Sequence, residues 1–120
     1  MVTVGIPSRH LNPNSRCHWA IKAKAVKSGR VESWTATQVA MHEQKVSGGW
    51  IRAACEIRWY AQNNRRRDAD NCLSSLKATL DGVVDAGLLK NDSGLSFLPM
   101  MIAVDPMNPR VELRMTRVDD

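Results

Sequence analysis

The sequence lacks the features of several common protein classes. It has no apolar run approaching the roughly 18 residues that a membrane-spanning helix requires. Its N-terminus has no basic segment followed by an apolar one, as a secretory signal would, so we expect a cytoplasmic protein. It also has no internal repeat, linker or low-complexity segment. A chain of 120 residues without such divisions suits a single domain, residues 1–120.

Cysteine and histidine are few and widely spaced. The cysteines at positions 17, 55 and 72 form no Cys-x-x-Cys pair, so neither a zinc site nor a disulfide framework is indicated. The three histidines show no metal-ligand spacing either. We therefore expect thiols buried in a reducing compartment and histidines with structural roles.

Basic charge is abundant, and it is unevenly placed. The formal net charge of +5 favours a polyanionic partner. Residues 1–67 hold 12 Lys and Arg against 3 acidic residues, whereas residues 68–120 hold 5 against 9. A solvated basic face without a partner is the simpler interpretation. A binding surface that leads into an acidic metal site explains the asymmetry better.

Hydrophobic periodicity predicts an α+β fold, with four runs typical of strands and two typical of helices. The predicted strands are residues 2–6, 50–60, 97–104 and 111–118, and the predicted helices are residues 16–45 and 71–86. We expect the last two strands to form a hairpin. The result is a small mixed or antiparallel sheet of about four strands packed with two main helices.

Side-chain spacing predicts which faces are buried. In the second predicted strand, alternate residues from Ile51 to Trp59 face the core, and charged residues lie between them. In the first predicted helix we expect Trp19 and Trp34 to be core anchors. We expect Asn14 or Ser15 to cap that helix, and residues 28–29 to break or kink it.

One stretch concentrates the chemistry of the chain. Arg65, Arg66 and Arg67 run directly into Asp68 and Asp70. Guanidinium groups suit phosphate, and paired carboxylates suit a hard divalent cation. Side chains two apart in an extended segment point the same way, so both carboxylates could reach one cation beside a helix start. This suggests phosphodiester chemistry on a nucleic acid, with a helix cap and a solvated charge as the alternative.

The segment that follows predicts a single helix with two stripes. Leu73, Leu76 and Leu80 form the buried stripe. The adjoining polar stripe consists of Asp70, Ser74, Lys77 and Asp81. Gly87 ends the helix, and a short turn then delivers Asp92 as a third carboxylate.

Taken together, residues 65–93 resemble the RusA family of small Holliday junction resolvases, which are common in phages and prophages. The shared features are the run Arg-Arg-Arg-Asp-Ala-Asp-Asn, the helix with its lysine and aspartate, and Asn-Asp-Ser at positions 91–93. The resemblance implies a homodimeric, Mg²⁺-dependent endonuclease, with Mn²⁺ as an alternative metal. Such an enzyme nicks two strands of a four-way DNA junction symmetrically in recombination or repair, here in a bacterial host cytoplasm.

The resemblance also assigns roles to residues. Asp68, Asp70 and Asp92 match the family's metal-binding aspartates. Arg65, Arg66 and Arg67 match its DNA-binding segment, and Asn71 and Asp81 match supporting positions.

The lysine position departs from the family pattern. Several members place the lysine three residues after the motif asparagine, where this chain has Ser74. The four-residue spacing from Lys77 to Asp81 is kept, so we interpret the difference as an insertion of about one helical turn. We predict that Lys77 is the catalytic cation.

Other functions fit part of the sequence. A non-catalytic basic protein that binds DNA junctions would use the arginines and give the acids no task. A nucleotide-sugar transferase would use Asp-x-Asp, but it would need a glycine-rich βαβ entry that the chain lacks. A degenerate resolvase, which binds junctions without cutting them, is less compatible with the intact carboxylates.

Overall fold

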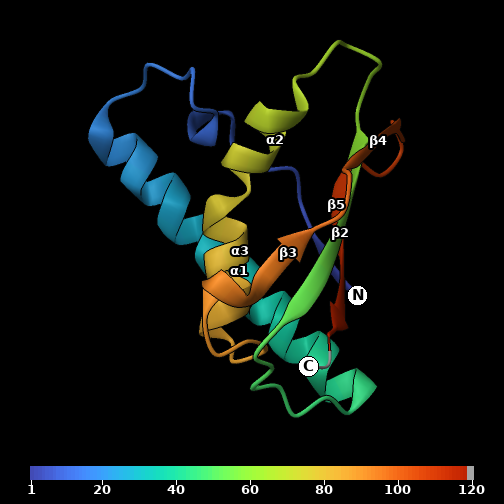
Figure 1. Cartoon of the computed structure of the whole chain (residues 1–120). Helices are drawn as coiled ribbons and strands as arrows, with labels where there is room; N and C mark the ends of the chain where they lie inside the picture. Colours follow the sequence, from blue (N-terminus) through green and yellow to red (C-terminus); the bar gives the residue numbers. More distant parts are fainter. Residues whose placement is uncertain (119–120) are drawn as a thin grey trace.

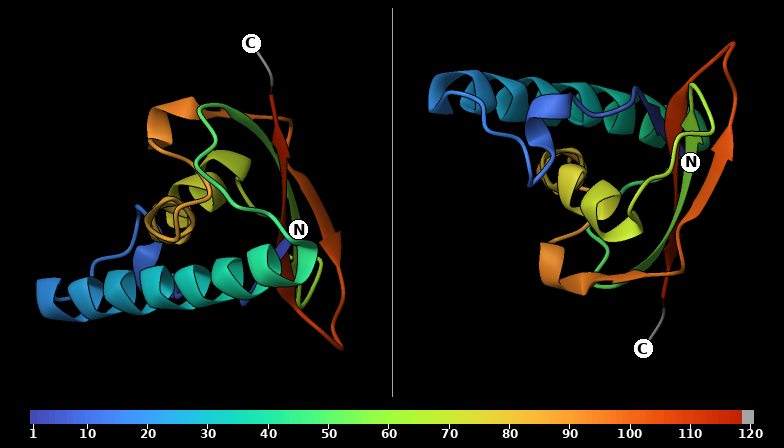
Figure 2. Two further views of the ribbon diagram at one scale, coloured as in Figure 1. Left: turned by 90° about the horizontal axis from the view of Figure 1, so that it is seen from below. Right: turned by 90° about the horizontal axis from the view of Figure 1, so that it is seen from above.

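The computed structural model describes residues 1–118. It confirms the α+β class: helices cover one face of a mixed, five-stranded sheet, and the other face of the sheet is open (Figures 1 and 2). Within those residues, no helix is both long and apolar enough to cross a membrane.

The first half of the chain alternates between strands and helices, and the last three strands are consecutive. The helices are α1 (Trp19–Gln44), α2 (Ala69–Ser75) and α3 (Lys77–Asp85), with short 3₁₀ turns η1 (Arg9–Leu11) and η2 (Asp92–Gly94). The strands are β1 (Val2–Val4), β2 (Ala53–Ala61), β3 (Leu95–Phe97), β4 (Met101–Val104) and β5 (Arg110–Arg117).

Strand β2 is the centre of the sheet. β5 runs antiparallel along one edge of β2, and β1 runs antiparallel to β5. On the other edge, β3 and β4 pair in parallel with successive parts of β2. The alternation predicted for β2 is confirmed from Ala53 to Trp59, but Ile51 lies before the strand and is exposed.

The predicted C-terminal hairpin is wrong, because β4 and β5 pair with opposite edges of β2 and not with each other. The run predicted as one strand over residues 97–104 is also divided into β3 and β4. Pro99 lies between the two, and proline has no N–H to donate to a strand ladder.

Helix α1 is long, with 26 residues, and it has little amphipathic character. It is unbroken through residues 28–29, and its N-cap is His18, whose Nδ1 accepts the Ala20 N–H at 3.2 Å, so neither Asn14 nor Ser15 caps it. The prediction that Trp19 and Trp34 anchor the core is wrong, since their exposed fractions are 76% and 44%.

A different face of α1 is buried. Ser33 and Thr37 are fully buried there, where α1 crosses α3 at Gly82. A Cβ atom placed on Gly82 would overlap Ser33 Oγ and the carbonyl oxygen of Arg30. The missing side chain lets the two helices approach closely, so small polar residues fill the contact that tryptophan was expected to occupy.

The helix predicted over residues 71–86 is two helices. Leu76 separates them with φ −88° and ψ 1°, and its N–H bonds to the Leu73 carbonyl at 3.0 Å, which tightens the last turn of α2. The Leu76 side chain is completely buried between the helices and the sheet. A leucine stripe at helical spacing is compatible with either arrangement, so the sequence did not reveal the break.

Candidate nucleic-acid interface

The candidate site begins at the N-terminus of α2. Asp68 is its N-cap, and the Asp68 Oδ1 atom accepts the N–H groups of Asp70 at 2.9 Å and Asn71 at 3.3 Å. Both carboxylates are on exposed residues, at the end of the helix where the backbone dipole favours negative charge. Two residues predicted as metal ligands, Asp68 and Asp70, are therefore close together, and the Asp68 side chain is hydrogen-bonded to the Asp70 backbone.

The local geometry differs from the one used in the prediction. Residues 68–70 were expected to be extended, which would point both carboxylates the same way. In the structure only Asp68 is extended (φ −85°, ψ 121°), and Asp70 is already the second residue of the helix. The alternation of an extended strand therefore does not orient these two carboxylates, although the two residues remain close at the start of α2.

The three arginines differ in their environments. The Arg67 guanidinium donates to the backbone carbonyls of Asn63 at 2.9 Å and Arg65 at 2.7 Å, and to Asn63 Oδ1 at 3.0 Å. These bonds fix the loop before α2. Arg65 and Arg66 are exposed, and their side chains make no hydrogen bond or ion pair within residues 1–118. They are the members of the run whose guanidinium groups are available to a ligand.

A hollow of about 370 Å³ joins the arginines to Asp68, and we call it the arginine groove. It is lined by Ile6, Pro7, Ser8, Arg9, Asn12, Trp59, Arg65, Arg66, Arg67, Asp68, Asn71, Cys72 and Ser75. Burial raises the pKa of the Cys72 thiol, Arg67 lowers it and Asp68 raises it further. This thiol therefore lies in the fields of both the basic and the acidic residues of the groove.

The groove contains a residue that the sequence analysis missed. Arg9 lies 56 positions before Arg65 in the chain, and η1 brings it into the lining of the same groove. The only signal in the sequence was the general basicity of the first half. No periodicity or motif connects a residue in a loop to a helix start so far along the chain.

The third predicted ligand lies elsewhere. Asp92 is the first residue of η2, and the Asn91 side chain caps that turn by accepting the Ser93 N–H at 3.0 Å. Figure 2 shows η1 and η2 on opposite sides of the α2–α3 column. Within the described residues 1–118, no three His, Cys, Asp or Glu side chains form a group that could hold a metal ion. Asp68 and Asp70 therefore lie close together, and Asp92 does not form a three-carboxylate group with them.

Lys77 and Asp81 lie on α3 and no longer share a helix with Asp70 and Ser74. Lys77 is the first residue of α3, and its side chain is 77% exposed. Its Nζ atom lies 3.9 Å from Asp81 Oδ1, one helical turn along. An exposed pair of this kind is weak, so the ammonium group can turn toward a phosphate at little cost.

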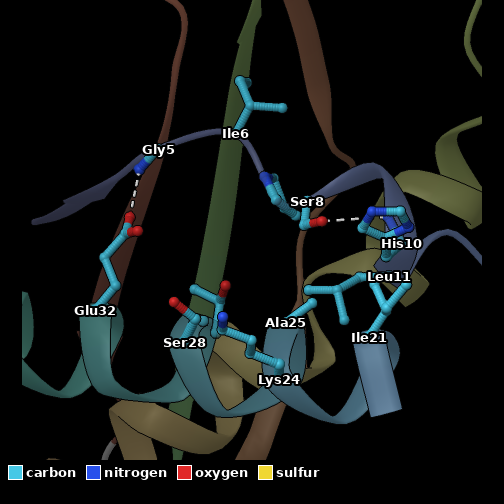
Figure 3. A pocket seen from close by; sticks show the side chains of 13 residues that line it. Gly5, Ile6, Ser8, His10, Leu11, Ile21, Lys24, Ala25, Ser28 and Glu32 are labelled. Atoms are coloured by element: carbon cyan, nitrogen blue, oxygen red, sulfur yellow. Dashed lines mark hydrogen bonds between the residues drawn. The ribbon is translucent and has the colours of Figure 1, made fainter. Parts of the chain in front are cut away.

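A second hollow adjoins the site on the α1 side. It measures about 410 Å³ and lies between the N-terminal segment and α1 (Figure 3). Across it, the Gly5 N–H donates to Glu32 Oε1 at 2.6 Å, and this bond attaches the N-terminal segment to α1. Within that segment the His10 N–H donates to Ser8 Oγ at 3.2 Å, which caps the 3₁₀ turn that carries Arg9.

Comparison with known proteins adds a distant relative. No protein-family model matches the chain. The chain is similar to an uncharacterized protein of Xylella fastidiosa (strain Temecula1 / ATCC 700964), with 31% identity over 93 residues. The match covers 71% of this chain and 56% of that protein, so the chain spans little more than half of the relative's length. The relative's description names no activity, and the resemblance to the RusA family stays a prediction.

Proposed function

We propose that this protein is a Mg²⁺-dependent endonuclease that cuts branched DNA, such as a four-way junction, in the manner of the RusA family. One observation carries the proposal: four arginines and Asp68 line a single groove at the start of α2, beside Asp70. Guanidinium groups there would bind backbone phosphates and position the strand against the carboxylates.

The residues present fit a magnesium ion in part. Mg²⁺ is commonly bound through one or two carboxylates, with water and substrate phosphate completing its shell. Asp68 uses Oδ1 to cap α2, and its Oδ2 accepts no hydrogen bond within residues 1–118. Oδ2 and the Asp70 carboxylate would hold the ion, and the resemblance adds Asp92. When bound, the ion supplies charge stabilisation and a more acidic water for in-line attack on phosphorus.

The remaining steps belong to the chain's own side chains. Arg65 and Arg66 would bind phosphates beside the scissile one and fix the register of the strand. The Lys77 ammonium would offset negative charge that develops on the phosphoryl oxygens. Asn71 would support the site from the next position of α2. A two-fold dimer would present two equivalent sites to the two strands that are cut.

The setting of this activity is part of the same proposal. The RusA-like features indicate a phage or prophage protein that acts in the cytoplasm of a bacterial host. Recombination junctions and branched phage DNA would both offer the required four-way substrate.

A second candidate is a protein that binds DNA junctions without cutting them. The structure favours it in one respect: capping of α2 already gives Asp68 a structural task, and Asp92 does not join the other two aspartates. This candidate uses the same arginine groove and differs from the first only in chemistry.

A cleavage assay separates the two candidates. The protein is incubated with a synthetic four-way junction and Mg²⁺ or Mn²⁺, with linear duplex as the control substrate and Asp70→Asn as the control variant. We expect paired symmetric nicks in the junction only, and none with the variant. A parent protein that binds the junction and leaves it intact with both metals would contradict the nuclease proposal.

A further inference from the structure

The arginine groove continues along the N-terminal segment into another hollow. This third hollow, of about 610 Å³, is lined by Arg9, His10, Asn12, Asn14, Ser15, Arg16 and Cys17. Arg9 and Asn12 line both the arginine groove and this third hollow. The two therefore adjoin at η1, and together they form one surface that extends from the start of α2 to the start of α1.

The charge of this combined surface is strongly one-sided. Its linings include five arginines, at positions 9, 16, 65, 66 and 67, and a single acidic residue, Asp68. The side chains of Arg9 and Arg16 are exposed and make no hydrogen bond or ion pair within residues 1–118. Their charge is thus uncompensated by the protein, which favours an anionic ligand with more than one charged group.

The backbone that carries Arg9 and Arg16 is held in place from several sides. Ser8 caps η1, and Glu32 of α1 accepts the Gly5 N–H (Figure 3). In the turn that follows, Asn12 accepts the Asn14 N–H at its side chain (2.9 Å) and the Ser15 N–H at its carbonyl oxygen (2.9 Å). A preorganised segment loses less conformational entropy when it binds a ligand.

We propose that residues 9–16 form a second phosphate-contacting element, in which Arg9 and Arg16 bind the backbone of the DNA arm that enters the arginine groove. The inference rests on the proposed function and extends it to the substrate, which would need a further run of nucleotides beyond the scissile phosphate. Guanidinium groups bind phosphate through paired hydrogen bonds, and the amides and hydroxyls between them are common sugar–phosphate contacts. The continuity with Arg65, Arg66 and Asp68 favours nucleic acid over an acidic peptide.

The salt dependence of binding tests this element. Affinity for a four-way junction is measured over a series of salt concentrations, without divalent cation, for Arg9→Ala, Arg16→Ala and the double variant. The plot of log affinity against log salt concentration has a negative slope. Each lost phosphate contact should make that slope less steep by about 0.9, and the double variant should reduce its steepness by about twice that amount. The matched control is Arg114→Ala. This substitution removes the same charge as the others, but Arg114 is exposed on β5, in register with Glu56 on the sheet face turned away from the helices, and lines neither hollow.

The outcomes distinguish this inference from the proposed function. The Arg9 and Arg16 variants could have the same salt dependence as Arg114→Ala, while Arg65→Ala and Arg66→Ala make the slope less steep. In that case the extended element is wrong and the nuclease proposal stands. If the parent binds no DNA, both fail. If poly-glutamate binds with the same dependence on Arg9 and Arg16, the surface is a general polyanion site, and the inference is also overturned.

Discussion

The Asp68 carboxylate accepts the Asp70 N–H at 2.9 Å, so one predicted metal ligand caps the helix that carries the other. Asp68 therefore has a structural task that is independent of any metal. A loss of activity after its removal has two possible causes, a frayed helix or a missing ligand. Suitable substitutions separate them.

Asp68→Asn should keep the stability of the fold and abolish cleavage. Asparagine caps helices about as well as aspartate, but it lacks the charge that a divalent cation requires. Asp68→Ala should abolish cleavage too and should also lower the free energy of unfolding by about 1 kcal/mol. Urea unfolding and junction cleavage are measured on both variants. Cleavage by Asp68→Asn at the parental rate would show that Asp68 only caps α2.

Lys77→Ala should lower the rate of cleavage by about 100-fold or more with little change in junction binding, because its ammonium group is expected to act on the phosphoryl oxygens. Ser74→Ala should be nearly silent, and Lys77→Arg should restore only part of the rate, since guanidinium differs in shape and hydration. Single-turnover cleavage at saturating enzyme separates chemistry from affinity. A Lys77→Ala rate within about threefold of the parent would mean that the activation free energy rises by less than roughly 0.7 kcal/mol, and it would rule out this role.

Gly82→Ala should destabilise the protein by about 1–3 kcal/mol, the usual cost of overpacking a close contact. The added methyl group would overlap Ser33 Oγ and force α1 away from α3. Gly29→Ala is the matched control in the same helix pair. A Cβ atom there would lie 3.5 Å from the Ala78 Cβ atom, an ordinary contact, so the better helix propensity of alanine should stabilise by up to about 1 kcal/mol. Equal effects of the two substitutions in urea unfolding would contradict the packing at Gly82.

The loop between β4 and β5 should contribute stability that depends on acid pH. The hydrogen bond from Arg110 to Asp105, 2.7 Å long, is the main cause that lowers the pKa of the Asp105 carboxyl below its usual value. A carboxyl whose pKa is lower when folded stabilises the fold above its unfolded pKa, about 3.9, and loses that contribution as the pH falls through the lower, folded value.

Unfolding of the parent and of Asp105→Asn from pH 6 down to pH 2 measures this contribution. We expect the difference in stability between the two proteins to shrink as the pH falls below about 3.9 and to vanish once the pH is below the lower, folded pKa, because protonated aspartate and asparagine are both neutral. Arg110 keeps its bond to Glu112 (2.9 Å) and its position over the Tyr60 ring, so the loop should stay folded in the variant. A difference that stays constant with pH would mean that the ion pair does not carry the effect.

The sequence by itself determined the elements whose signal is local. Alternation from Ala53 to Trp59 placed β2, and it does so because a strand with one buried face must alternate. The end of the second helical region near Gly87 was equally local, since Gly87 adopts φ 92°, which favours glycine. The arginine run and its junction with Asp68 and Asp70 were visible for the same reason, because those residues adjoin along the chain.

Only the tertiary structure decided which surfaces meet. Periodicity shows that a face is apolar but not what covers it, so the pairing of β4 with β2 and the break at Leu76 were not predictable. α1 buries Ser33 because Gly82 of a distant helix leaves room for small side chains alone at that crossing, whereas Trp19 at the start of α1 is exposed. In the same way, Arg9 enters the groove of residues 65–68 because α1 holds η1 against it, a relationship between segments that no local pattern records.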